Sequence, residues 1–256
     1  MQTIDLNCDL GESFGAWSMG NDEAVLGFIS SANIACGFHA GDANTMLRTV
    51  HAAAAKGVAI GAHPSLPDLQ GFGRREMQVS AAEVHALVLY QVGALAAFAR
   101  AAGTQLTHVK PHGALYNMAA RDVALADAIA GAVKGFDAGL VLVGLAGSEL
   151  PRAGMRAGLR VAHEAFADRR YRRDGSLVSR REPDAVIHDI AAAVKQAVAI
   201  VVQGQVTAQD GSVFKLKADT ICVHGDRPDA AQIAEQLRDA LLRAGFDIAA
   251  ATGASA

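Results

Sequence analysis

Short apolar runs that stop at glycine and polar residues recur along the chain, and segments with helical periodicity lie between them. Apolar runs of about four to eight residues, bounded in this way, are typical of strands buried on both faces of a parallel sheet. The predicted strands occupy residues 3–9, 32–36, 58–62, 106–111, 139–145, 159–163 and 219–224.

Helix signals fill the intervals between these strands. Ser80 and Glu83 form a capping box, and Gly103 ends the long Ala- and Leu-rich helix that follows. Further helices are predicted from Asp42 to Lys56, from Asp122 to Gly135, from Pro183 to about Val198 and from Pro228 to Gly245. Strands that alternate with helices predict an α/β fold, here a seven-stranded parallel β/α barrel of the TIM type.

One segment interrupts the alternation. Residues 205–219 read as a β-hairpin with Asp210 and Gly211 at its turn, added to the barrel just before its last strand. We find no linker and no repeat. Residues 1–248 are therefore predicted to form a single barrel domain, and residues 249–256 a small-residue tail.

Composition narrows the class of protein. Of the 256 residues, 51% are hydrophobic but only 5% aromatic, which suits a helix-wrapped parallel sheet. A net charge of −3 with scattered basic residues indicates neither a nucleic-acid nor a membrane partner. The N-terminus lacks a secretory signal, no apolar run reaches about 18 residues, and three cysteines show no paired spacing. We expect a cytoplasmic protein with free thiols.

Four histidines, each near a glycine, follow predicted strands. The carboxyl ends of parallel strands meet at one edge of an α/β fold, where ligands bind. Side chains at several strand ends are therefore expected to converge on one pocket, which predicts an enzyme. The histidines are His39, His63, His112 and His224, and acidic residues at other strand ends are Asp5, Asp9, Glu12 and Glu164.

Basic residues add candidate anion-binding groups. Lys110 ends a predicted strand, so its ammonium should point into the barrel mouth. A buried lysine needs either a substrate anion or a carboxylate such as Asp9 or Glu164, and both readings stay open. Arg74 and Arg170 lie in long loops after strands and are candidates for binding an anionic group.

Long segments of the chain resemble one known family. The strings DLNCDLGESFG, NIACGFHAGD, GAHPSLPDLQGFGRREM, HVKPHGALYN, EAFADRRYRRDGSLVSR and ADTICVHGD are similar to the LamB/YcsF family. The resemblance implies a barrel related to the glycoside hydrolase/deacetylase superfamily. It also implies hydrolysis of 5-oxo-L-proline (pyroglutamate) to L-glutamate, with ATP as co-substrate, in a complex with 5-oxoprolinase subunits B and C. No Gly-Lys pair of a P-loop occurs, so either a partner handles ATP or the barrel binds it without that signature.

This activity suggests roles for the strand-end residues. Asp9 or His63 would activate water as general base, and Lys110 or His112 would stabilise developing negative charge. Arg74 or Arg170 would hold the substrate carboxylate. The predicted substrate-binding residues are Asn7, Glu12, His39, Arg74, Glu164, Arg170 and His224.

Three further possibilities remain. Related deacetylase barrels hold a divalent metal with one Asp and two His, for which Asp9, His39 and His63 are the candidate set. The chain could then be a stand-alone, metal-dependent carbohydrate deacetylase or amidohydrolase. Alternatively it could be a non-catalytic subunit that presents substrate to its partners, and a homo-oligomer is also open.

Overall fold

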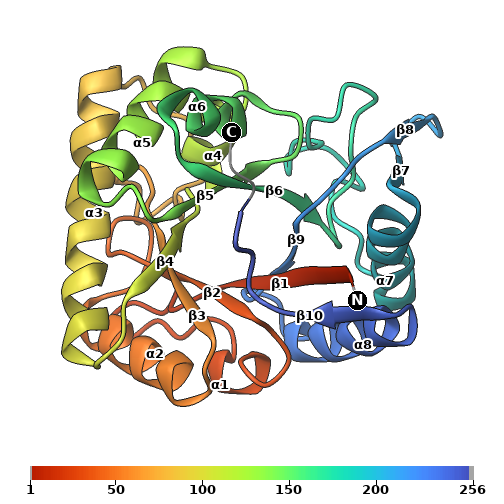
Figure 1. The fold of residues 1–256 in the computed structure, drawn as a ribbon, viewed down its shortest axis with the longest axis horizontal. Helices are drawn as coiled ribbons and strands as arrows, with labels where there is room; N and C mark the ends of the chain where they lie inside the picture. Colours follow the sequence, from red (N-terminus) through yellow and green to blue (C-terminus); the bar gives the residue numbers. More distant parts are fainter. Residues whose placement is uncertain (1, 254–256) are drawn as a thin grey trace.

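The computed structural model describes residues 2–253, and its centre is a closed barrel of seven parallel strands (Figure 1). Closure occurs where the first strand pairs with both the second and the last, Asp5 lying opposite Thr220. The seven-stranded prediction is confirmed. The strands are β1 (Gln2–Leu10), β2 (Ser31–Ala35), β3 (Ala59–His63), β4 (Leu106–Val109), β5 (Val141–Leu145), β6 (Arg160–Phe166) and β9 (Thr220–His224).

Strand β1 shows how the barrel wall is built. Leu6 and Leu10 belong to the apolar clusters that bury the surrounding helices. The alternate residues Asn7 and Asp9 instead contact polar side chains of neighbouring strands, because successive residues of a strand point to opposite faces. Asn33 of β2, for example, donates to Asn7 Oδ1 at 2.7 Å and to Asp9 Oδ1 at 2.9 Å. A polar network therefore runs inside the barrel, where such folds usually place Val, Ile and Leu.

The covering helices agree with the predicted ones except at one boundary. The capping box of Ser80 and Glu83 is present. Helix α7 begins at Ile190, so its predicted start at Pro183 is wrong. Asp189 caps it by accepting from Ala192 N at 2.7 Å, while the preceding segment is irregular. The helices are α2 (Ala43–Ala55), α3 (Ala81–Ala101), α5 (Val123–Phe136), α7 (Ile190–Val198), which continues as the π-helical η1 (Ala199–Gln203), and α8 (Ala230–Arg243).

Several shorter elements carry weaker sequence signals and were not predicted. β10 adds a short parallel strand beside the start of β1, with Phe246 opposite Gln2. The predicted hairpin is confirmed as the antiparallel pair of β7 (Gln205–Thr207) and β8 (Val213–Lys215). The unpredicted elements are α1 (Asp22–Val25), α4 (Gly113–Ala119), α6 (Glu149–Ala157) and β10 (Phe246–Ile248).

Helix α3 is long and apolar enough to cross a membrane by length and composition alone. In the structure it packs against α5 and against strands β3 and β4. Its residues Val84, Val88 and Leu95 are fully buried in the largest apolar cluster. These contacts are those of a helix in the wall of a barrel.

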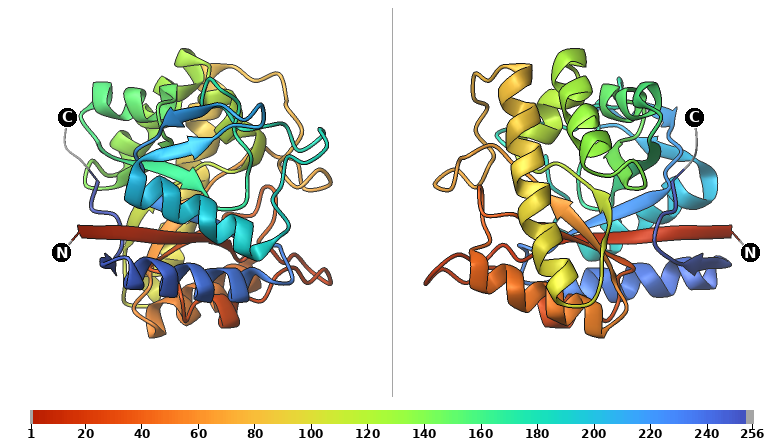
Figure 2. Two further views of the ribbon diagram at one scale, coloured as in Figure 1. Left: turned by 90° about the vertical axis from the view of Figure 1, so that its right-hand side faces the viewer. Right: turned by 60° about the vertical axis from the view of Figure 1, so that its left-hand side comes forward.

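The two ends of the barrel differ. The chain begins at one end, and the loops that follow the strands project from the opposite end in both views of Figure 2. Of the predicted tail, residues 249–253 follow the barrel wall, where Arg160 donates to Thr252 O at 2.9 Å. Residues 254–256 lie outside the described residues, and a domain boundary at residue 248 stays a prediction.

Candidate functional site

The carboxyl ends of the strands open into a cavity of about 1240 Å³. Its size is at or above the upper end of the range of small-molecule sites. Strand-end residues form its floor, and the loops after β3 and β6 contribute arginines to its wall. The sequence-predicted residues among its lining are Asp9, His63, Arg74, Lys110, His112 and His224.

Most of the other predicted residues lie behind this lining. Asn7 and Glu164 contact Lys110, Glu12 approaches His112, and His39 stacks on it. Arg170 differs from them, because the neighbouring Arg169 is the residue that lines the cavity.

A lysine centre, which we define as Lys110, Asn7, Asp9, Glu164 and Cys222, occupies the barrel mouth. Lys110 is only 2% exposed. Its Nζ lies 2.8 Å from Asp9 Oδ1, 2.8 Å from Glu164 Oε1, 3.1 Å from Asn7 Oδ1 and 3.1 Å from Cys222 Sγ. Burial alone would lower the pKa of Lys110, but the charge of Asp9 and its neighbours holds it well above the ordinary value. The ammonium is therefore a fixed cation.

Asp9 links this centre to the histidines. Its Oδ1 accepts from Lys110 and from Asn33, while its Oδ2 lies 3.4 Å from His63 Nε2. Burial raises the pKa of Asp9, but the charges of His63 and Lys110 outweigh burial and hold it well below the usual range. Asp9 is thus a carboxylate whose second oxygen faces a histidine.

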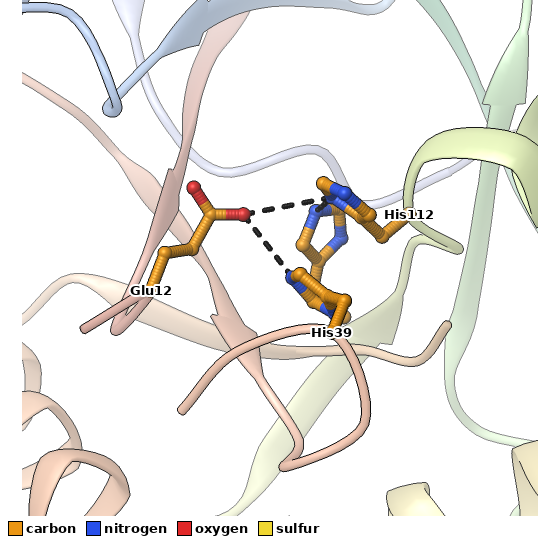
Figure 3. A group of neighbouring side chains, drawn as sticks. Glu12, His39 and His112 are labelled. Carbon is orange, nitrogen blue, oxygen red and sulfur yellow. Dashed lines mark hydrogen bonds and ion pairs between the residues drawn. The ribbon is translucent and has the colours of Figure 1, made fainter. Parts of the chain in front are cut away.

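A histidine cluster, defined here as Glu12, His39, His63 and His112, adjoins the lysine centre. Glu12 Oε1 lies 3.2 Å from His39 Nε2 and 3.5 Å from His112 Nδ1, as Figure 3 shows. His63 Nε2 lies 2.9 Å from His112 Nδ1. The remaining nitrogens of the last two rings face backbone carbonyls, His63 Nδ1 at 2.7 Å from Lys110 O and His112 Nε2 at 2.8 Å from Phe72 O.

Burial sets the charge of this cluster. It lowers the pKa of His39 and His112 well below the ordinary value, and neighbouring histidines add to the effect. Burial, together with the charge of Asp9, raises the pKa of Glu12 well above its usual range. These three groups therefore favour their neutral forms near pH 7.

The loop after β3 approaches these rings closely. Phe72 has a φ of 54°, an uncommon conformation for a residue with a side chain, and its carbonyl contacts His112. Gly73 follows with a φ of 64°, and a Cβ there would lie 2.8 Å from both His39 and His112. Glycine at this position lets the loop close over the histidine cluster.

Sequence reasoning missed several residues of the site. Tyr116 donates to Glu164 Oε2 at 2.6 Å, and Asp168 Oδ1 lies 2.7 Å from His224 Nδ1. Burial raises the pKa of Asp168, but His224 and nearby arginines outweigh it and lower it to about 2. Tyr116 follows His112 by one helical turn, and Asp168 follows Glu164 at even spacing. Both spacings could have placed them near the site.

Arg169 was also missed, although its neighbour Arg170 was predicted. It is 5% exposed and donates through Nη2 to Val178 O at 2.6 Å. Its Nε is buried and has no hydrogen-bond partner among residues 2–253. Arg74, the predicted arginine of the other loop, is bound to Asp226 at 2.6 Å. Arg169 is therefore the guanidinium with an unmet donor at the cavity wall.

Two groups of described side chains have ligand atoms within 4.8 Å of one another, the spacing that a metal ion requires. One group is the histidine cluster, and the other comprises Asp9, Cys222 and His224. The predicted set of Asp9, His39 and His63 is divided between these two groups.

The arrangement can be compared with known proteins. A sequence model of the LamB/YcsF family matches residues 4–256. The chain belongs to the LamB/YcsF family. A relative from Methylococcus capsulatus, which is named as the first of the 5-oxoprolinase subunits, is 60% identical over 98% of this chain and 97% of its own length.

Solved structures agree with this assignment. The lactam utilization protein of Thermus thermophilus is 50% identical, covers 97% of this chain and 100% of its own, and superposes with a TM-score of 0.91. A family 4 carbohydrate esterase from Streptomyces lividans covers 96% of this chain and 91% of its own, with a TM-score of 0.50 and 11% identity. At that identity the esterase shows only that the barrel is of the deacetylase type.

Proposed function

We propose that this chain is the lactam-opening subunit of an ATP-dependent 5-oxoprolinase, which hydrolyses 5-oxo-L-proline to L-glutamate. The observation that carries the proposal is the cavity itself, where a fixed cation, Lys110, lies beside the Asp9 and His63 pair. The names of the 5-oxoprolinase and lactam-utilization relatives supply the substrate class.

Hydrolysis requires water to add to the lactam carbonyl carbon, after which the carbon–nitrogen bond breaks and the amine leaves with a proton. Asp9 Oδ2 and His63 Nε2 lie 3.4 Å apart and line the cavity, so this pair would activate the water. Lys110 and His112 line the same floor and would stabilise the negative charge that develops on the carbonyl oxygen or on a phosphorylated form of it.

The substrate carboxylate needs a cation of its own. Arg169 fits this role better than Arg170, because Arg169 lines the cavity and has a buried donor to satisfy. Arg74 lines the cavity as well but is bound to Asp226. A guanidinium that gains a carboxylate partner on binding gives charge-assisted hydrogen bonds and discriminates against an uncharged lactam.

ATP enters the proposal through partner subunits B and C, because the sequence has no P-loop. A five-membered lactam is a stable amide, so the free energy of ATP hydrolysis must be coupled to its opening. The three buried cysteines, Cys8, Cys36 and Cys222, are free thiols, and we place the complex in the reducing cytoplasm.

Reconstitution tests the proposal. The isolated chain should not convert 5-oxo-L-proline with ATP, whereas addition of subunits B and C should yield glutamate and ADP. Asp9→Asn should abolish glutamate formation in the complex. Asp127→Asn, at an exposed surface ion pair, is the matched control and should leave it unchanged.

Other outcomes would select the other functions. Amide or ester hydrolysis by the isolated chain without ATP, abolished by a chelator, would identify a stand-alone deacetylase or amidohydrolase. A complex in which Asp9→Asn weakens substrate binding but keeps the turnover number would identify a subunit that only presents substrate.

A further inference from the structure

The hydrogen bonds of His63 and His112 leave a contact that two neutral rings cannot make. A carbonyl oxygen only accepts, so His63 Nδ1 must donate to Lys110 O, and His112 Nε2 must donate to Phe72 O. A neutral imidazole carries one proton. The two nitrogens that face each other at 2.9 Å, His63 Nε2 and His112 Nδ1, therefore both present lone pairs.

Something positive must lie between these lone pairs, either a shared proton or a cation. The carboxylates around them favour a cation of higher charge. Glu12 Oε1 is 3.5 Å from His112 Nδ1, and Asp9 Oδ2 is 3.4 Å from His63 Nε2. Two lone pairs and two carboxylate oxygens thus surround one point at the barrel mouth.

We propose that His63 Nε2, His112 Nδ1 and Glu12 Oε1 bind one divalent cation, and that zinc is the ion whose preferences they match. Two imidazoles and one Glu, with a position left open, form a set found in catalytic zinc sites. With bonds of about 2.0–2.1 Å in a tetrahedral site, ligand atoms lie roughly 3.3 Å apart. The distances of 2.9 and 3.5 Å bracket this value.

The surroundings of these ligands support the assignment. A histidine that binds a metal usually donates its other N–H to a carbonyl or carboxylate, which fixes the ring and its tautomer. Both rings have this partner, Lys110 O for His63 and Phe72 O for His112. The uncommon conformation of Phe72 holds the second carbonyl in place.

Two nearby candidates fit less well as ligands. The rings of His39 and His112 are stacked, with centroids 3.8 Å apart and planes at 7°. An ion in the plane of His112 would therefore lie over the face of His39 and away from its lone pairs. Asp9 already accepts from Lys110 and Asn33 through Oδ1, and only its Oδ2 faces the site.

The site stands on this geometry, and only its use in lactam opening rests on the proposed function. When bound, a divalent ion supplies Lewis-acid chemistry and lowers the pKa of a bound water. His63 would then provide a ligand atom, and Asp9 Oδ2 would keep its place beside it as the acceptor of a proton.

Metal content of the full-length protein tests the site without substrate or partners. Protein stripped with a chelator and dialysed against zinc should hold one ion per chain by elemental analysis. X-ray absorption should show two imidazoles among nitrogen and oxygen ligands. Zinc at about 100 times its dissociation constant should raise the melting temperature by roughly 5–10 °C.

Single substitutions locate the ion. His63→Asn, His112→Asn and Glu12→Gln should each lower the zinc content to below about one fifth of an ion per chain, since loss of a ligand removes a large part of the affinity. His39→Gln is the matched control from the same cluster and should retain one ion. Circular dichroism verifies that each variant is folded, and a variant that fails to fold is replaced by His63→Gln or His112→Gln.

Two results would overturn the proposal. Wild-type protein that takes up neither zinc nor cobalt, with an unchanged melting temperature, would show that a shared proton joins His63 and His112. Equal zinc content in all the variants would place the ion elsewhere. Neither result bears on whether the reconstituted complex forms glutamate, so the two proposals fail separately.

Discussion

The lysine centre and the histidine cluster lie side by side but differ in how completely their polar atoms are paired. Lys110 has four polar neighbours within 3.1 Å, and its charge is balanced by Asp9 and Glu164. In the histidine cluster, two lone pairs face each other at 2.9 Å. Complete pairing indicates a fixed electrostatic element, whereas incomplete pairing of buried groups indicates a site for a ligand.

The largest effect is expected where pairing is complete. Lys110→Met would leave the carboxylates of Asp9 and Glu164 buried without their cation. We expect a loss of about 3–5 kcal/mol in the free energy of unfolding. Turnover of the reconstituted complex should fall at least ~100-fold in the protein that remains folded. Denaturant unfolding and glutamate formation are measured on the same preparation.

This expectation goes beyond what the sequence allowed. From position alone, Lys110 could serve either a substrate anion or a structural ion pair, and the two ion pairs indicate that one cation does both. The double variant Lys110→Met/Asp9→Asn should regain part of the lost stability. A single variant within about 1 kcal/mol of wild type would contradict the description of a balanced buried centre.

An intermediate effect is expected at Arg169, whose buried Nε lacks a partner among the described residues. Arg169→Gln should raise the KM for 5-oxo-L-proline by roughly 10-fold or more, the scale of one charged hydrogen bond. Arg170→Gln, next to it in the chain but not part of the cavity lining, should change KM little. Equal effects of the two substitutions would remove Arg169 from the carboxylate site.

The smallest effect concerns His108, a buried histidine with both ring nitrogens paired. Its Nε2 is 2.8 Å from Asn33 Oδ1 and its Nδ1 is 2.8 Å from Thr107 Oγ1. Burial, with the charge of Lys110, lowers its pKa to about 3. The unfolded chain, with a histidine pKa near ~6.5, binds a proton that the folded state refuses, so stability falls as the pH drops from about 6.5 to about 3.

Replacement of this residue isolates its contribution. His108→Gln should flatten the dependence of unfolding free energy on pH by up to ~1.4 kcal/mol per pH unit in that window, and by nothing above pH ~7. Chemical denaturation at a series of pH values gives both slopes. Parallel curves for the two proteins would mean that His108 is protonated in the folded state.

The fold could be predicted because its signals are local. Apolar runs ended by glycine located all seven strands, and the Ser80 capping box marked the start of α3. Helix α7 was placed too early because Pro183 satisfies a helix start, whereas Asp189 supplies the cap. β10 has only three residues and depends on pairing with β1, which no local pattern reveals.

The candidate site was predictable in location but not in pairing. Position at a strand end brought His63, His112 and Lys110 to one cavity. Which nitrogen of His112 carries a proton depends on the carbonyl of Phe72, far away in sequence. The choice between Arg169 and Arg170 depends on which side chain the loop turns inward. These are tertiary facts, and sequence spacing does not contain them.

Closure of the barrel also governs when the site can exist during synthesis. β1 pairs with β9 and β10, and Thr220 hydrogen-bonds Asp5 across a separation of 215 residues. The first strand to leave the ribosome must wait for nearly the last, so closure carries a high contact order and a slow search. Until then the polar interior of β1 stays open to water. A chaperone that shields the nascent half-barrel would act on this interval.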